Sequence, residues 1–222
     1  MAEYFPHDVL ELQGYFAPLQ PGQKIQAVPA TGTEVPLYIL GSSQFGAMLA
    51  AEFGLPYAFA SHFAPQLLLA ALELYRSRFR PSAVLERPHA IAGINIVAAD
   101  TDAEARRLAT TQQMSFTNLI RGTRRLSQPP IDDIETYWSP IEKAQVTQML
   151  ARSIVGSPDT VRQGIRDFVA ETGVDEMIVV SDIFDHSARL RSFEIISSCA
   201  RDVAPPGRPQ QKPSIDRESP GV

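Results

Sequence analysis

The strongest constraint on the fold is a series of apolar runs that alternate with helical segments. Four runs predict buried strands: residues 36–40 (PLYIL), 57–61 (YAFAS), 89–98 (HAIAGINIVA) and 176–181 (EMIVVS). Each run is continuously apolar, which is typical of parallel strands that are covered on both faces. Strands that alternate with helices favour a parallel sheet with right-handed crossovers. The sequence therefore predicts an α/β fold and disfavours an antiparallel sandwich.

The segments between these runs carry helix start and stop signals. Gly54 is a typical C-cap, Thr101 and Glu104 form a capping box, and Ser139-Pro140 and Ser157-Pro158 each open a helix. We also expect a helix over residues 6–16 and a short strand over 25–28. Apolar side chains at helical spacing predict inward stripes on three of these helices. The helix after Pro65 is expected to turn Leu67, Leu68, Ala71, Leu72 and Tyr75 inward. The long helix after Thr101 is expected to turn inward Ala105, Leu108, Ala109, Phe116, Leu119 and Ile120, and the last helix carries Leu190, Phe193 and Ile196.

Composition separates a folded region from a polar tail. Residues 202–222 are rich in Pro, Gly, Gln and charge and have almost nothing to bury. They predict a disordered C-terminal tail after one domain over residues 1–201.

Charge and cysteine content exclude several classes of protein. The net charge is −5, and Arg121, Arg124 and Arg125 are the densest basic patch, so we expect no nucleic-acid partner. The single cysteine, Cys199, excludes an internal disulfide and a zinc site of paired cysteines, and we expect no metal. Residues 1–12 lack a signal-peptide pattern and the apolar stretch over 64–75 is too short to span a bilayer. We therefore expect a cytoplasmic protein without membrane contact.

The sharpest local signal is Gly41-Ser42-Ser43 between a predicted strand and a predicted helix. A helix N-terminus leaves backbone N–H groups unpaired, and two hydroxyls beside a glycine add donors for an anion. The alternative is that Ser43 is only an N-cap. No lysine follows, as a nucleoside-triphosphate loop requires, and no G-x-G-x-x-G follows a strand.

Two further candidates lie at strand ends. His62 follows the second strand, where it either meets a ligand and moves a proton or orients the loop through backbone contacts. Asp182 follows the last strand, where a barrel places active-site acids, whereas Asp185 and His186 are expected to cap and start the next helix.

Two other motifs leave alternatives open. Val155-Gly156-Ser157-Pro158 resembles a second anion site, although Pro158 favours ordinary helix initiation. Tyr137 and Trp138 either wall a cofactor or substrate pocket or anchor the loop before them.

Two long segments resemble the luciferase-like monooxygenase family. They are residues 37–65 (LYILGSSQFGAMLAAEFGLPYAFASHFAP) and 154–196 (IVGSPDTVRQGIRDFVAETGVDEMIVVSDIFDHSARLRSFEII). The resemblance implies a (β/α)₈ barrel that oxygenates an organic substrate with O₂ and reduced flavin mononucleotide (FMN). A separate flavin reductase supplies that flavin, and some branches use a deazaflavin. It also implies that Ser43 contacts the flavin phosphate, that Ser42 lines the same loop with Gly41, and that His62 lies at the active-site rim.

Length limits how much of that barrel is expected. A complete barrel takes about 250 residues, so we expect a partial (β/α)₈ TIM barrel, the C-terminal half, with its N-terminal strands missing. Open strand edges and exposed interior then favour a homo-oligomer or a complementing N-terminal half. The alternative functions are a non-catalytic remnant that binds a phosphate-bearing ligand or a partner chain, and an aldolase- or isomerase-like half barrel. The latter would want a lysine or paired acids at its strand ends.

Overall fold

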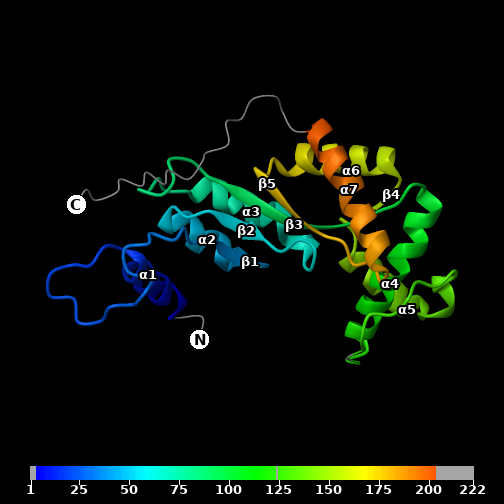
Figure 1. Ribbon diagram of the computed structural model, residues 1–222, viewed down its shortest axis with the longest axis horizontal. Helices are drawn as coiled ribbons and strands as arrows, with labels where there is room; N and C mark the ends of the chain where they lie inside the picture. The colour runs from blue at the N-terminus through cyan, green and yellow to red at the C-terminus, as the bar shows by residue number, and fades with distance from the viewer. Residues whose placement is uncertain (1–3, 124, 204–222) are drawn as a thin grey trace, which may run out of the picture.

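The computed structural model describes residues 4–123 and 125–203. Its strands are β1 (Ile39–Gly41), β2 (Tyr57–Phe59), β3 (Ala90–Ala98), β4 (Ile154–Gly156) and β5 (Glu176–Val180). Its α-helices are α1 (Phe5–Phe16), α2 (Gln44–Phe53), α3 (Leu68–Arg78), α4 (Asp102–Ile120), α5 (Pro140–Met149), α6 (Pro158–Thr172) and α7 (His186–Val203). Short 3₁₀ turns cover η1 (Pro65–Leu67) and η2 (Ile134–Thr136). Figure 1 shows that α1 lies at one end of the molecule and that α4 and α5 lie at the other.

All strand pairs of the sheet are parallel, as the apolar runs predicted. The strand order is β1-β2-β3-β4, and β5 pairs with the first half of β3. The short strand β4 pairs with the last residues of β3, where Ile96 faces Ile154. The α/β class with a parallel sheet and flanking helices is therefore confirmed.

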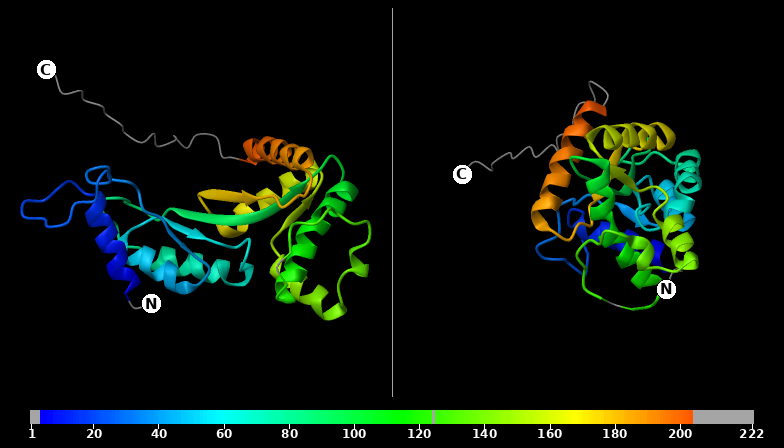
Figure 2. Two further views of the ribbon diagram at one scale, coloured as in Figure 1. Left: turned by 60° about the horizontal axis from the view of Figure 1, so that its bottom comes forward. Right: turned by 90° about the vertical axis from the view of Figure 1, so that its right-hand side faces the viewer.

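Helices cover one face of the sheet. Alternate residues of β3, including Ile94 and Ile96, pack into a core with α2, α3, α6 and α7. The two views of Figure 2 show these helices arranged around the strands. Tyr57 and Tyr75 are fully buried in this core, and the Tyr75 hydroxyl donates to the Leu55 carbonyl at 2.9 Å. Burial raises the pKa of Tyr75 to about 12.

The opposite face of the sheet is only partly covered, so the expectation that both faces are covered is wrong for the outer strands. Leu40 on β1 is 69% exposed, and on β5 Ile178 is 56% exposed. Within the described residues, β1 and β5 each pair on one side only. This agrees with the expected exposure of strand edges and apolar interior. We call the partly covered side the open face.

Some local predictions are wrong for identifiable reasons. Residues 25–28 form no strand, because the following loop folds back on α1: the Gly32 and Glu34 N–H groups both bond to the Phe16 carbonyl. The sequence also missed β4. Most members of the predicted inward stripes are buried: Leu68, Ala71, Leu72, Tyr75, Ala105, Leu108, Ala109 and Ile196. Four others are instead exposed: Leu67, Leu119, Leu190 and Phe193.

The last helix buries a face that is partly polar. Its buried residues are Ser192, Ile195, Ile196 and Cys199, and the Ser192 hydroxyl accepts a bond from the Ala98 N–H at 3.0 Å at the end of β3. Asp202 belongs to this helix, so the predicted tail begins too early, and its residues 204–222 lie outside the described residues. Cys199 is buried, and its thiol donates to the Pro158 carbonyl at 3.2 Å.

Candidate functional site

The predicted site residues lie along one edge of the sheet. Because β1, β2, β3 and β5 are parallel, their carboxyl ends meet at the same edge, where α/β proteins place ligands. The Gly41–Ser43 loop, His62 and Asp182 follow β1, β2 and β5 there. In the described parts of the chain, no hydrogen bond links these three groups to one another, so they share an edge without forming one network.

In the candidate phosphate loop, the Ser43 hydroxyl does not cap the helix that follows. Ser43 is the N-cap residue of α2, with φ −141° and ψ 170°, but its side chain makes no cap hydrogen bond. The position predicted for a cap is therefore right and the side-chain cap itself is absent. The loop is held instead from β2, because the Tyr57 hydroxyl donates to the Ser43 carbonyl at 3.2 Å. Ser43 itself is exposed.

A pocket of about 470 Å³ opens beside this loop. Gly41, Ser43 and Gly46 line it together with Leu40, Phe45 and two α1 residues, Phe5 and Asp8. The Phe5 and Phe45 rings lie 6.4 Å apart, so α1 forms one wall. Asp8 is the one acidic group among the described residues of the lining, and its carboxylate opposes an anion there.

A second pocket of about 580 Å³ lies between α3 and α6. Arg76 and Thr172 line it near the carboxyl ends of these helices. In a βα unit, this end of a helix leads toward the amino end of the next strand, a side associated with stability rather than catalysis. We therefore consider the smaller pocket at the Gly41–Ser43 loop to be the candidate ligand site.

His62 lies against β3. Its carbonyl accepts a bond from the Asn95 side-chain amide at 2.7 Å, and its ring packs on Gly93. The Nδ1 atom is buried and has no hydrogen-bond partner among the described residues. The loop-orienting backbone contact and an unsatisfied ring nitrogen are thus both present.

Asp182 is partly buried, and its burial raises the pKa of the carboxyl, with Arg189 opposing the shift. A carboxyl with a raised pKa at a strand end is a common property of functional acids. Its neighbours have structural roles, as predicted. The Asp185 carboxylate accepts from the Ala188 N–H at 2.7 Å, and His186 begins α7.

The second anion motif is occupied by the chain itself. The Asp102 carboxylate accepts from the Ser157 N–H at 2.6 Å and from the Thr160 hydroxyl at 2.8 Å. These bonds lower the pKa of Asp102, and the bond from the Ser157 N–H has the largest effect. The motif therefore binds an anion, but that anion is an aspartate of α4, and helix initiation at Pro158 proceeds as expected.

Tyr137 and Trp138 make the contacts expected of residues that anchor the loop before them. The Tyr137 hydroxyl lies 3.0 Å from the Asn118 side-chain oxygen and 2.9 Å from that of Gln128. The Trp138 indole donates to Glu135 at 3.2 Å. The Arg121 guanidinium lies 5.1 Å from the Tyr137 ring centre.

Arg121, part of the densest basic patch, is also neutralised within the fold. It forms a two-pronged ion pair with Glu142, at 2.7 Å and 3.0 Å. This pairing is the main cause that lowers the pKa of Glu142 to about 2.

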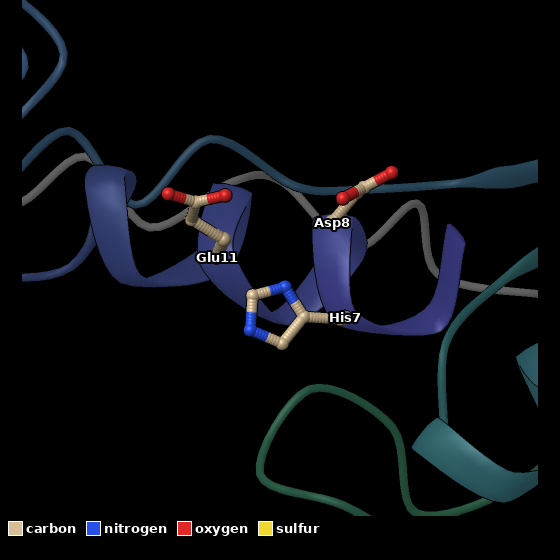
Figure 3. A group of neighbouring side chains, drawn as sticks. All are labelled: His7, Asp8 and Glu11. Atoms are coloured by element: carbon tan, nitrogen blue, oxygen red, sulfur yellow. The ribbon is translucent and has the colours of Figure 1, made fainter. Parts of the chain in front are cut away.

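One group of potential metal ligands occurs among the described residues. Figure 3 shows His7, Asp8 and Glu11 projecting from α1. Their potential ligand atoms all lie within 4.8 Å of one another. All three are exposed, and the Tyr15 hydroxyl already donates to Glu11 at 2.5 Å. Exposed acidic groups of this kind are common without an ion, so this group alone is not evidence for a metal site. None of the helices in the described ranges is both long and apolar enough to cross a bilayer.

Sequence reasoning missed the residues that position these groups. Gly93 and Asn95 lie in the apolar run 89–98. A glycine and a polar amide inside a buried strand indicate a close approach and a hydrogen bond, and this was the signal that could have found them. No role was predicted for Asp102. Its bond to Ser157 spans 55 residues, so no local pattern could reveal it.

Comparisons with known proteins agree with this geometry. The profile of the luciferase-like monooxygenase family matches residues 3–176. YvbT of Bacillus subtilis is 47% identical over 196 residues, which cover 88% of this chain and 58% of YvbT. A luciferase-like monooxygenase of Escherichia coli K12 is 48% identical over 191 residues, which cover 86% of this chain and 57% of that protein.

A solved structure has the same fold. The crystal structure of apo-MsnO8 superposes with a TM-score of 0.76 and 29% identity, over 92% of this chain and 62% of that one. This chain therefore spans less than two thirds of the length of each of these three proteins. The family profile, the identities and the parallel barrel-type sheet together show that the chain belongs to the luciferase-like monooxygenase family.

Proposed function

We propose that this chain forms the phosphate-binding side of the flavin site of a luciferase-like monooxygenase. The supporting observation is the loop between β1 and α2, where an exposed Ser43 hydroxyl is not used as a cap and a pocket opens beside it. The free N–H groups at the start of α2 favour a negatively charged ligand. A phosphate-bearing flavin fits this combination of donors.

The cofactor supplies the redox chemistry, because reduced flavin donates electrons to O₂ for the oxygenation of an organic substrate. The residues of this chain bind and orient it: Gly41, Ser42 and Ser43 hold the phosphate, while His62 and Asp182 lie at the same sheet edge and are our candidates for contacts with the reacting groups. FMN and a deazaflavin cofactor both carry phosphate, so the loop accommodates either. A flavin reductase and a small-molecule substrate are the partners that this function requires.

Thermal shift with FMN tests the proposal. FMN should raise the melting temperature of the chain, and riboflavin, which lacks the phosphate, should raise it much less. Ser43→Asp places a like charge at the site and should abolish the FMN shift. Ser127→Asp adds the same charge in an exposed loop and should leave the shift intact. An equal shift with FMN and riboflavin contradicts a phosphate site at this loop.

Asp8 provides a test in the opposite direction. Its carboxylate lines the pocket beside Ser43 and repels a phosphate. Asp8→Asn should therefore strengthen FMN binding, by up to about tenfold for roughly 1.4 kcal/mol. If FMN fluorescence titration shows weaker binding to this variant, the phosphate lies elsewhere.

A non-catalytic role is the second candidate, and the open face favours it. Leu40 and Ile178 are exposed, and β1 and β5 have unpaired edges within the described residues. Such a surface fits a partner chain, a second copy or a complementing N-terminal half. Substrate oxygenation by the purified chain with FMN and a reductase would exclude this role. A monomeric elution in size-exclusion chromatography with a sharp melt would argue against exposed docking edges.

A further inference from the structure

Gly93 has a steric role in the middle of β3. A Cβ atom built on it would lie 2.3 Å from the His62 Nδ1 and 3.0 Å from the His62 Cε1. Its φ does not lie in the left-handed region, so the backbone does not require glycine there. The requirement is space, because a glycine in a strand lets another group approach closely. The His62 ring occupies that space.

Two buried polar residues fix the main chain around this ring. The Ser61 hydroxyl donates to the Gly93 carbonyl at 2.5 Å, and the Asn95 amide donates to the His62 carbonyl at 2.7 Å. Ser61 and Asn95 are only 3% and 4% exposed. Buried polar groups are costly unless they form hydrogen bonds. Both residues use these bonds to hold the segment of His62 on β3.

The sheet register places His62 on the open face. Gly93 faces Ile178, and Asn95 faces Val180, in the parallel pairing of β3 and β5. Side chains of paired positions point to the same side of a sheet. Ile178 is exposed, whereas the neighbouring positions Ile94 and Val179 belong to the helix-covered core. The imidazole therefore lies on the open face, the side of the sheet that helices cover only in part.

The buried nitrogen determines which tautomer the ring favours. Nδ1 is buried without a partner in the described part of the chain. A neutral imidazole carries one N–H, and placing it on Nδ1 would bury an unsatisfied donor. Placing it on Nε2 puts the donor on the ring edge that points away from Gly93.

We infer that Gly93, Ser61 and Asn95 are positioning residues that seat His62 on the open face with Nε2 as a hydrogen-bond donor. The donor is available to a ligand that lies over β3. Its partner is an acceptor such as a carbonyl oxygen or an aromatic ring nitrogen of the bound flavin or substrate. We call the placement of the His62 ring by Gly93, Ser61 and Asn95 the seat. The role of His62 as a donor to a ligand rests on the proposed function, but the seat does not.

A double-mutant cycle tests the seat without any ligand. Gly93→Ala should lower the melting temperature by about 5 °C, because overpacking the strand displaces the ring. In the His62→Ala background the same substitution should cost little, since the ring is gone. Gly14→Ala is the control, because a Cβ there meets nothing within 4 Å. An equal loss in both backgrounds overturns the seat.

Nitrogen NMR of histidine-labelled wild-type chain tests the donor and does not depend on a variant that folds poorly. The signals of His62 are assigned by their loss in His62→Gln. We expect the Nε2–H tautomer for His62, and a change of its signals in Gly93→Ala while those of His7, His89 and His186 stay unchanged. A proton on Nδ1 overturns the assignment of the donor.

FMN titration separates this inference from the proposed function. If wild type binds FMN, His62→Ala should weaken binding about three- to tenfold, the effect of one hydrogen bond, and His62→Gln should recover part of the loss. Unchanged FMN affinity in His62→Ala overturns the donor role. If wild type binds no FMN, the proposed flavin site fails. The double-mutant cycle and the NMR measurement of the tautomer then still test whether Gly93, Ser61 and Asn95 position His62.

Discussion

Two helix N-termini in this chain share a local pattern and differ in what satisfies them. Both α2 and α6 follow parallel strands, and both begin after a serine in extended conformation whose hydroxyl makes no cap bond, Ser43 and Ser157. At α6 the Asp102 carboxylate accepts from the Ser157 N–H at 2.6 Å. At α2 no side-chain cap is found among the described residues, and a pocket lies beside Ser43.

The difference shows how a fold distinguishes a structural anion site from a ligand site. The donors at the two helix starts are similar, because every helix begins with unpaired N–H groups. What differs is whether another element brings a negative charge to them. α4 supplies that charge to α6, whereas the acid nearest to the α2 pocket, Asp8, lines its wall without capping the helix.

The largest effect on stability is expected from a methyl group added at the start of α6, where Asp102 bonds to the Ser157 N–H. A Cβ on Gly156 would lie 2.4 Å from the Thr160 Cγ2 and 2.7 Å from the Asp102 Oδ1. Gly156→Ala should lower the free energy of unfolding by about 1–3 kcal/mol through overpacking. The matched variant is Gly41→Ala, whose Cβ would have no neighbour closer than 3.6 Å. Equal losses in urea unfolding of the two variants would remove the contrast between the two sites.

The elements that the sequence predicted depend on local patterns, whereas those that it missed depend on contacts between distant segments. The parallel sheet follows from continuous apolar runs, and α4 and α5 begin after the predicted N-caps, Thr101 and Ser139. β4 was missed because it has only three residues and is defined by its pairing with β3. On α7, Leu190 and Phe193 are exposed, and the buried face instead includes Ser192, whose bond to a strand N–H apolar periodicity does not record.

The candidate site was predictable to a similar extent. Its positions followed from strand ends, which parallel topology brings to one edge. Sequence alone left open whether Ser43 caps its helix, and the geometry shows that its hydroxyl does not. The seat of His62 depends on Gly93 and Asn95 across two strands, so it required the register of the sheet.

Removal of the Asp102 carboxylate, the anion at the start of α6, is expected to have the next largest effect on stability. Asp102→Ala leaves the Ser157 N–H and the Thr160 hydroxyl without their acceptor. The melting temperature should fall at pH 7. Because folding lowers the pKa of Asp102, its stabilising contribution is complete above the ordinary value of 3.8 and is lost as pH falls through the lowered value. The difference between wild type and variant should therefore shrink in acid.

An exposed ion pair provides the control for this experiment. Asp132 is bonded to Arg107 at 2.6 Å on the surface, where ion pairs contribute little. Asp132→Ala should change the melting temperature less than Asp102→Ala at pH 7. If both variants behave alike across the pH range, the Asp102 carboxylate does not act as a cap for α6.

The smallest effects decide whether Ser43 is free for a ligand. Ser139 forms a capping box on α5, with the Glu142 carboxylate 2.7 Å from the Ser139 N–H, so Ser139→Ala should cost about 1 kcal/mol. Ser43→Ala removes a hydroxyl that caps nothing and should change stability by only a few tenths of a kcal/mol. With FMN the order should reverse: Ser43→Ala loses part of the thermal shift and Ser139→Ala keeps it. A cost at Ser43 equal to that at Ser139 would identify Ser43 as an ordinary cap, and the distinction between the two helix starts would then rest on Asp102 alone.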